Sequence, residues 1–411
     1  MPKLNPKIVQ GLGWLAGALI LILLIVGAFY FFFREKGVDP APSDFGTSGT
    51  IPGTTPPGET PGEGDDTPTE ITLKPQLFQI HDRPVLSFVT FDRAGKSLVR
   101  FMEAGTGHVY EHDASTGKKV RISNTSIPQI STVVWSQNGN TLALQYAEGG
   151  TVKTAVGELA TSSEEGSFKK ITFLPEGITA VAVSPDGESV FYMSNTQTGS
   201  SGRVVRKDGS SSRVVFESAF SDWLVAWPNQ KVIAITSRVS ESGGIAYRVD
   251  PSAATSQLVR VTQGFFSGVL YNPAATVYLF APGWARGVTH HNIARRASYG
   301  VASINTIPDK CSWLATSTPK MICGSSMGTD SELIANPEGW LRGDFVSTDT
   351  LLYVDYVNGI WASLLTIEGA GDRQFDVAQI GTSPSFFTIT FKDKTTGTLW
   401  GAFVPEPLRK L

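Results

Sequence analysis

The sequence predicts an all-β fold, a seven-bladed β-propeller with four-stranded antiparallel blades, preceded by one transmembrane helix. Two observations predict the ring. A unit of apolar strand, turn and apolar strand recurs at the spacing of about 45 residues that propeller blades need, and the last unit lacks one strand that the start of the domain can supply. A third observation, an uncharged apolar run near the N-terminus, predicts the membrane helix.

The apolar run extends from Ile8 to Phe33 without a charged residue, which is long enough to cross a hydrocarbon core of about 30 Å. A signal-peptide core is usually only about 7 to 15 residues long and ends at small residues, whereas this run ends in FYFFF and meets Arg34. We therefore expect residues 8–33 to be an uncleaved signal anchor in contact with membrane lipid.

The charges beside the run predict its orientation. Lys3 and Lys7 lie in the short segment 1–7, which favours an N-terminus in the cytoplasm, and a long following domain is translocated largely regardless of its charge. The sequence thus predicts a single-pass protein of the cytoplasmic (inner) membrane with its main domain outside the cytoplasm.

Residues 34–74 are rich in Pro, Gly, Thr and acidic residues and contain few side chains that could form a core. Such a composition does not compensate the entropy lost on ordering, so we expect a flexible linker. The remaining residues, 75–411, are expected to form the propeller.

Five strand–turn–strand units precede the cysteine-containing segment. Their turns align on Asp92, Ser136, Ser184, Trp227 and Asn272, with spacings of 44, 48, 43 and 45 residues. The segment CSWLATSTPKMIC has the same form and predicts a sixth unit. Strands such as TAVAV and VIAIT are apolar on both faces, as expected of inner strands packed between neighbouring blades.

A seventh unit, Val377 to Val404, supplies three strands before the chain ends. The segment Leu77 to Asp82 lies upstream of the first unit and can supply the fourth. We therefore expect both ends of the domain to share one blade, because such closure removes the exposed edges of an open array.

Two turns carry a resemblance to a known group. SPDGESVFYM, beginning at Ser184, and VWSQNGNTLAL, beginning at Val134, resemble the repeats of WD-like and TolB-type bacterial β-propellers. The resemblance covers Leu77 to Val404 and implies a propeller that serves as a binding platform. Propellers host many unrelated functions, so it implies no specific partner.

Cys311 and Cys323 are the two cysteines of the chain. Since disulfides persist in oxidising compartments, an exported domain favours a bond between them across neighbouring strands. The alternative is two buried free thiols, which behave as small hydrophobic groups. A zinc site is disfavoured because neither a C-x-x-C pair nor a nearby histidine supplies further ligands.

The sequence contains no convincing catalytic or metal-binding motif. GSSMG matches G-x-S-x-G with Ser326, but a nucleophile elbow needs a later histidine, and none follows His291. A calcium loop of the D-x-D-x-D-G type is also missing. We therefore expect no catalytic residue, no cofactor and no metal.

A repeated G-W-x-R-G motif is the best candidate for a binding site. GWARG begins at Gly283 and GWLRG at Gly339, in consecutive units. Trp and Arg are enriched at interface hot spots, which suggests a shared face for a protein partner, although a repeated blade device in which Trp packs and Arg caps a strand explains the motif better. The candidate residues are Trp284, Arg286, Trp340 and Arg342, with His290, His291, Arg295 and Arg296.

These observations favour a non-catalytic module that binds or scaffolds another protein of the cell envelope. The net charge of −3 and the lack of a basic patch disfavour nucleic acid as a partner. Two alternatives remain: an envelope hydrolase or lyase acting on glycan or peptide at the propeller funnel, and a small-ligand sensor.

Overall fold

The computed structural model describes most of the second part of the chain. The described residues are 77–160, 168–238, 244–252, 255–262, 266–282, 288–293, 295, 297–300, 304–316, 318–326, 332–355, 360–365, 373–385 and 388–404. The predicted membrane span, 8–33, and the predicted linker, 34–74, lie outside them. Within the described part, no helix is both long and apolar enough to cross a membrane.

The described strands form seven four-stranded antiparallel sheets, which we call blades 1 to 7. Blade 1 holds β2 (Val85–Arg93), β3 (Lys96–Glu103), β4 (Val109–Asp113) and β5 (Lys119–Ser123). Blade 2 holds β6 (Ile130–Trp135), β7 (Thr141–Glu148), β8 (Thr151–Leu159) and β9 (Phe168–Phe173). Blade 3 holds β10 (Ile178–Val183), β11 (Ser189–Thr196), β12 (Gly199–Arg206) and β13 (Arg213–Ser218).

The next three blades follow the same order along the chain. Blade 4 holds β14 (Trp223–Asn229), β15 (Val232–Ser237), β16 (Gly244–Asp250) and β17 (Thr255–Thr262). Blade 5 holds β18 (Phe266–Tyr271), β19 (Val277–Pro282), β20 (Thr289–Asn292) and β21 (Ala297–Gly300). Blade 6 holds β22 (Cys311–Trp313), β23 (Met321–Ser326), β24 (Asp349–Asp355) and β25 (Ile360–Leu365).

Blade 7 joins the two ends of the domain. It holds β26 (Val377–Thr382), β27 (Thr388–Asp393), β28 (Leu399–Phe403) and β1 (Leu77–His81). Leu77 is the partner of Ala402 and Phe78 that of Gly401 in the antiparallel β1–β28 ladder. The predicted sharing of one blade by the two ends is therefore confirmed.

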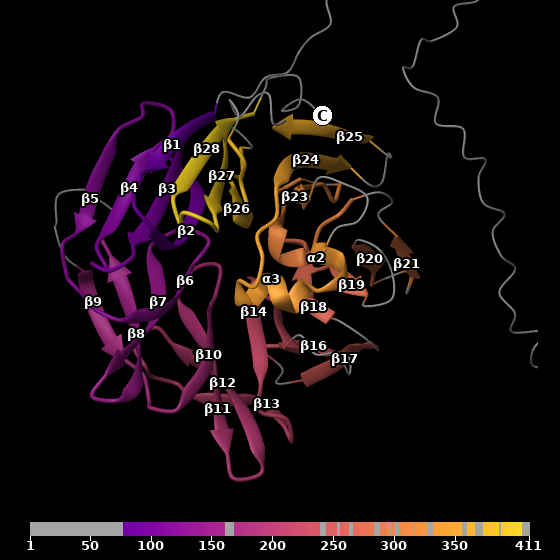
Figure 1. The fold of residues 1–411 in the computed structure, drawn as a ribbon. Coiled ribbons are helices and arrows are strands. Elements are labelled where there is room, and N and C mark those ends of the chain that lie inside the picture. The colour runs from indigo at the N-terminus through magenta and orange to yellow at the C-terminus, as the bar shows by residue number, and fades with distance from the viewer. Residues whose placement is uncertain are drawn as a thin grey trace, which may run out of the picture. The chain divides into compact units, whose positions relative to one another are not determined.

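The blades stand around a common centre as a propeller, as Figure 1 shows. The first strand of each blade is the innermost, since β2 contacts both β6 and β26, and β10 contacts both β6 and β14. Apolar side chains pack between neighbouring blades, for example Ile322 and Leu351 of blade 6 with Phe391 of blade 7. The predicted all-β propeller with four-stranded antiparallel blades is thus confirmed.

The turn between the first and second strands repeats because its sequence repeats. In blade 3, Ser184 Oγ donates to the Asp186 carboxylate at 2.6 Å and accepts from the Ser189 backbone N–H at 2.9 Å. Gly187 completes the turn with φ of 76°, a left-handed conformation that glycine adopts at little cost. In blade 2, Ser136 makes the same pair of bonds with Asn138 and Thr141.

The predicted disulfide is confirmed. Cys311 on β22 and Cys323 on β23 are directly opposite each other, their Cα atoms lie 4.1 Å apart, and the sulfurs are bonded. Because β22 has only three residues, the bond fixes the shortest inner strand to its neighbour.

Short helices occur where the chain enters and crosses blade 6. The 3-10 helix η1 (Pro308–Lys310) precedes β22, while α2 (Glu332–Ala335) and α3 (Pro337–Arg342) lie between β23 and β24. We call residues 332–342 the α2–α3 insert. Asn336 caps α3 by accepting from the Gly339 N–H at 2.8 Å, and Gly343 ends it with φ of 88°.

Candidate functional site

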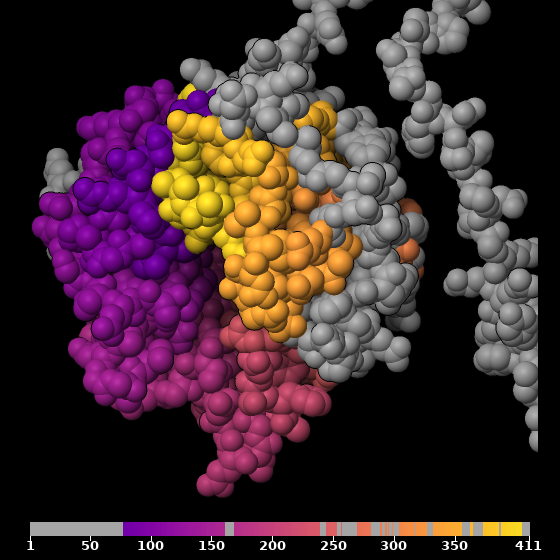
Figure 2. Space-filling model, viewed as in Figure 1, coloured from indigo at the N-terminus to yellow at the C-terminus, as the bar shows by residue number. Residues whose placement is uncertain are grey.

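The antiparallel blades give the ring two different faces. Connections from first to second strand, and from third to fourth, lie at one end of the strands, which we call the turn face. Connections from second to third strand, and from one blade to the next, lie at the other end, which we call the insert face. The α2–α3 insert joins β23 to β24 and therefore belongs to the insert face. Figure 2 shows this face, with a hollow beside the orange atoms of the insert.

Both G-W-x-R-G motifs fall between the second and third strands of their blades, 5 and 6. Trp284 and Arg286 lie outside the described residues. Trp340 lies on α3 with only 2% of its surface exposed, so it contacts its own chain. This is the packing role that the sequence had left open as the alternative. Arg342 is exposed and forms ion pairs with Asp344 at 2.7 Å and Glu338 at 2.9 Å.

Three of the remaining candidates belong to blade 5. His290 and His291 belong to β20, opposite Leu279 and Tyr278 of β19. Arg295 is exposed in the turn from β20 to β21, which is a connection of the turn face. Arg296 lies outside the described residues. Arg295 therefore lies at the opposite end of the strands from the α2–α3 insert, which carries Trp340.

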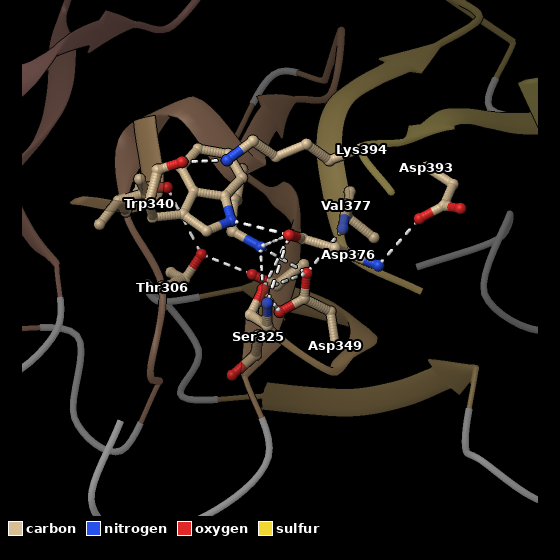
Figure 3. A network of polar contacts seen from close by, with 12 residues as sticks. Thr306, Ser325, Trp340, Asp349, Asp376, Val377, Asp393 and Lys394 are labelled. Carbon is tan, nitrogen blue, oxygen red and sulfur yellow. Dashed lines mark hydrogen bonds and ion pairs between the residues drawn. The ribbon is translucent and has the colours of Figure 1, made fainter. Parts of the chain in front are cut away.

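A buried ionic cluster beneath the α2–α3 insert was missed by the sequence reasoning. Lys310, which is fully buried, reaches the carboxylates of Asp349 at 2.5 Å and Asp376 at 2.8 Å, as well as Ser347 Oγ at 2.5 Å. Figure 3 shows Asp349 and Asp376 converging below the Trp340 indole. The indole N–H donates to both oxygens of Asp376, at 2.8 and 3.1 Å.

A second lysine completes the cluster. The Lys394 ammonium lies 4.1 Å from the centre of the Trp340 ring and donates to the Trp340 carbonyl, while the Lys310 ammonium lies 4.4 Å from the same ring centre. Both distances are typical of cation–π interactions. The Lys310 ammonium thus pairs with both carboxylates, while Lys394, which is only partly buried, contacts the Trp340 ring.

Burial shifts the pKa values within the cluster. Removal from water raises the pKa of Asp349, although the charge of Lys310 opposes the change. Removal from water lowers the pKa of Lys394, and the negative charge of Asp376 opposes this change. Ser347 and Lys310 are close enough to suggest a nucleophile and its base, but the ammonium donates to two carboxylates and both residues are buried. The cluster therefore suits a clamp that fixes the insert to blades 6 and 7.

A cavity of about 250 Å³ lies at the inner edge of blades 4 and 5. Leu224, Val225 and Ala226 of β14 line it, together with Val269 and Leu270 of β18 and Asp309 of η1. The residue is exposed, while desolvation of its carboxyl group by the surrounding protein raises the pKa of that group to about 6.

An apolar groove of about 210 Å³ lies along the outer strand of blade 2. Ile171 and Phe173 of β9 are 39% and 67% exposed, so two large apolar side chains of one strand lie together at the surface. Phe168 lies at the other end of β9, and its ring packs over Gly157 of β8, where an added Cβ would come within 2.7 Å of the ring. Ile127 and Tyr146 also line the groove.

Ser326, in the G-x-S-x-G match, and possible metal ligands are the remaining candidates for chemistry. Ser326 ends β23, an antiparallel strand, and residues 327–331 separate it from α2. A nucleophile elbow needs an abrupt turn from strand to helix, so this position does not match one. Among the described residues, no group of three His, Cys, Asp or Glu side chains could hold a metal ion.

Comparisons with known proteins show the fold but no family. No family model and no curated protein match this sequence. One similar structure is TolB from Acinetobacter baumannii, with 10% identity and a TM-score of 0.43; the match covers 75% of this chain and 64% of the TolB chain.

Another similar structure is a chain of the mitotic checkpoint complex, with 11% identity and a TM-score of 0.52. The match covers 88% of this chain and all of the other, 100%. At this level of identity the likeness concerns the arrangement of strands alone, and by that arrangement the chain is similar to known β-propellers.

Proposed function

We propose that this protein is a membrane-anchored β-propeller outside the cytoplasm that binds another protein of the cell envelope without catalysing a reaction. The uncharged run 8–33 supports the anchor, and the bond between Cys311 and Cys323 fits an oxidising compartment. The observation that carries the binding function is the apolar groove along β9 of blade 2.

The groove has the properties of a site for an extended peptide. β9 is the last strand of its sheet, so one edge is available for main-chain hydrogen bonds from an added strand. Ile171 and Phe173 lie two residues apart on β9 and hence on one face, where alternate side chains of a peptide would pack.

The charges of β9 suggest which peptide binds. Lys169 and Lys170 are both exposed on this strand. Lysines on an edge strand oppose pairing with a second copy of the same strand, and they attract acidic side chains. The partner segment that fits is therefore extended, with apolar residues at alternate positions and acidic residues beside them.

A photo-crosslinking amino acid at position 173, in the full-length protein in its native membrane, tests this proposal. Position 220 is the matched control, because Phe220 is also exposed, at 60%, but lies between blades 3 and 4. We expect crosslinks from position 173 alone, to a segment of one envelope protein whose sequence, identified by mass spectrometry, has apolar residues at alternate positions with acidic residues beside them.

A synthetic peptide of that segment gives the second readout. It should bind the purified protein, and binding should be lost in an Ile171→Asp/Phe173→Asp variant but kept in Phe220→Asp. A peptide that binds all three forms equally, or crosslinks that favour position 220, would disprove the groove as the site.

A further inference from the structure

Among the described residues that line the cavity at the inner edge of blades 4 and 5, one is charged, and no described residue pairs with it. Asp309 has neither an ion pair nor a side-chain hydrogen bond to another residue in the described part of the chain. The neighbouring Lys310 does not form an ion pair with Asp309, because the ammonium of Lys310 donates to Asp349, Asp376 and Ser347.

The walls around Asp309 are uncharged. β14, β15 and β18, which line the cavity, contain no acidic or basic residue, and neither do β19, β23 and β26, which pack against η1. Most of the lining side chains are apolar, including Leu224, Val225 and Val269. A single carboxylate in such a place attracts a cation that also carries an apolar part, since each part then meets a matching surface.

We propose that this cavity binds a small organic amine, whose ammonium group pairs with the Asp309 carboxylate and whose apolar part lies against the inner strands of blades 4 and 5. The volume sets the size of the ligand. At about 30 Å³ for each water molecule, the cavity holds roughly eight waters, which is the size class of a short aryl-alkyl amine. This site is independent of the groove on blade 2.

Three probes that share one phenethyl group and differ in charge test the site: phenethylamine, its neutral analogue 2-phenylethanol and its anionic analogue 3-phenylpropionate. We expect calorimetric titration of the full-length protein in detergent at pH 7.5 to show binding of the amine. The alcohol should bind about tenfold more weakly or worse, because it lacks the charged hydrogen bond, and the anion should not bind.

Asp309→Asn should reduce the affinity for the amine to that for the alcohol. Asp82→Asn is the matched control, since Asp82 is an exposed aspartate of another blade-to-blade connection and should leave the affinity unchanged. Ala226→Leu fills part of the cavity without changing its charge and should weaken both amine and alcohol. Circular dichroism confirms that each variant is folded.

The pH dependence provides an independent readout. Because the pKa of Asp309 is raised to about 6, the carboxylate becomes protonated as the pH falls from 7.5 to 5, and the affinity for the amine should fall with it. Equal affinity for amine and alcohol, or amine binding that survives in Asp309→Asn, would overturn the proposal.

Discussion

Arg100 and Lys310 are both buried cations between neighbouring blades, but different groups neutralise them. Arg100 on β3 donates to the carboxylate of Glu111 at 2.7 Å and reaches across to the Gly139 carbonyl of blade 2 at 2.7 Å. Lys310 instead meets two carboxylates, of Asp349 and Asp376, that are themselves buried.

The two sites differ in the acceptor groups that lose their partner when the cation is removed. Without Arg100, the side chain of Glu111 is still 15% exposed and can be hydrated, and the other acceptors include neutral carbonyl oxygens. Without Lys310, two carboxylates would remain together where water does not reach them. A cation that holds buried anions therefore matters more to stability than one that holds neutral groups.

Lys310→Met should have the largest effect, a loss of about 3–5 kcal/mol in the free energy of unfolding, because it leaves buried carboxylates without their counterion. Urea unfolding of the full-length protein in detergent, followed by tryptophan fluorescence, measures it. Lys153→Met is the control, since Lys153 pairs with Glu176 at the surface and should change stability little. A loss for Lys310→Met as small as that of the control would contradict the comparison.

Removal of the disulfide by Cys311→Ala/Cys323→Ala should cost about 2–4 kcal/mol, as expected for a short closed loop. The bond begins at the residue next to Lys310, so the two changes should not be additive. The same urea titration of the combined variant tests this coupling. A combined loss equal to the sum of the two would mean that the cluster and the disulfide act independently.

Arg100→Met should destabilise the protein by about 1–3 kcal/mol, less than Lys310→Met, since it leaves mostly neutral acceptors without a donor. Methionine keeps the approximate length of the side chain, but it removes the cation–π contact of the guanidinium with the Phe91 ring, 5.5 Å from the ring centre. If Arg100→Met proves the more harmful change, the number of hydrogen bonds lost would matter more than the charge of the acceptors.

Asp309→Asn should have the smallest effect, because Asp309 is exposed and water screens its charge, and the effect should depend on pH. The folded pKa of about 6 lies above the value of about 3.9 in an unfolded chain, so the stability due to this group is fully present below about pH 4 and is lost as the pH rises through 6. The variant should therefore melt above the unmodified protein at pH 7.5 and close to it at pH 4. Melting curves that differ equally at both pH values would mean that Asp309 does not titrate in this range.

The sequence predicted the features that repeat. The turns at Ser136 and Ser184 carry their own hydrogen-bonding side chains, so their spacing identified the blades, and the spare segment at Leu77 identified the closing strand. The disulfide followed from the predicted compartment. Each of these predictions needed only local chemistry or a count along the chain.

The cluster around Lys310 could not be predicted in the same way. Its carboxylates follow Lys310 by 39 and 66 residues, and no periodic pattern relates them. The α3 helix could be predicted from the sequence more easily, because Asn336, Pro337 and Gly343 are typical residues of a helix start and end. The repeat of G-W-x-R-G drew attention to Trp340 as a contact for a partner, while its indole is in fact buried against Asp376.

The shared blade has a mechanical consequence. The chain that leads from the predicted membrane anchor continues directly into β1, so a pull on that chain loads the β1–β28 ladder before any other part of the ring. β1 is also the strand whose pairing joins the two ends of the domain. Tension along the linker would thus act on the hydrogen bonds between β1 and β28. Detaching β1 from β28 would open the ring at blade 7, while the other blades keep all four of their strands.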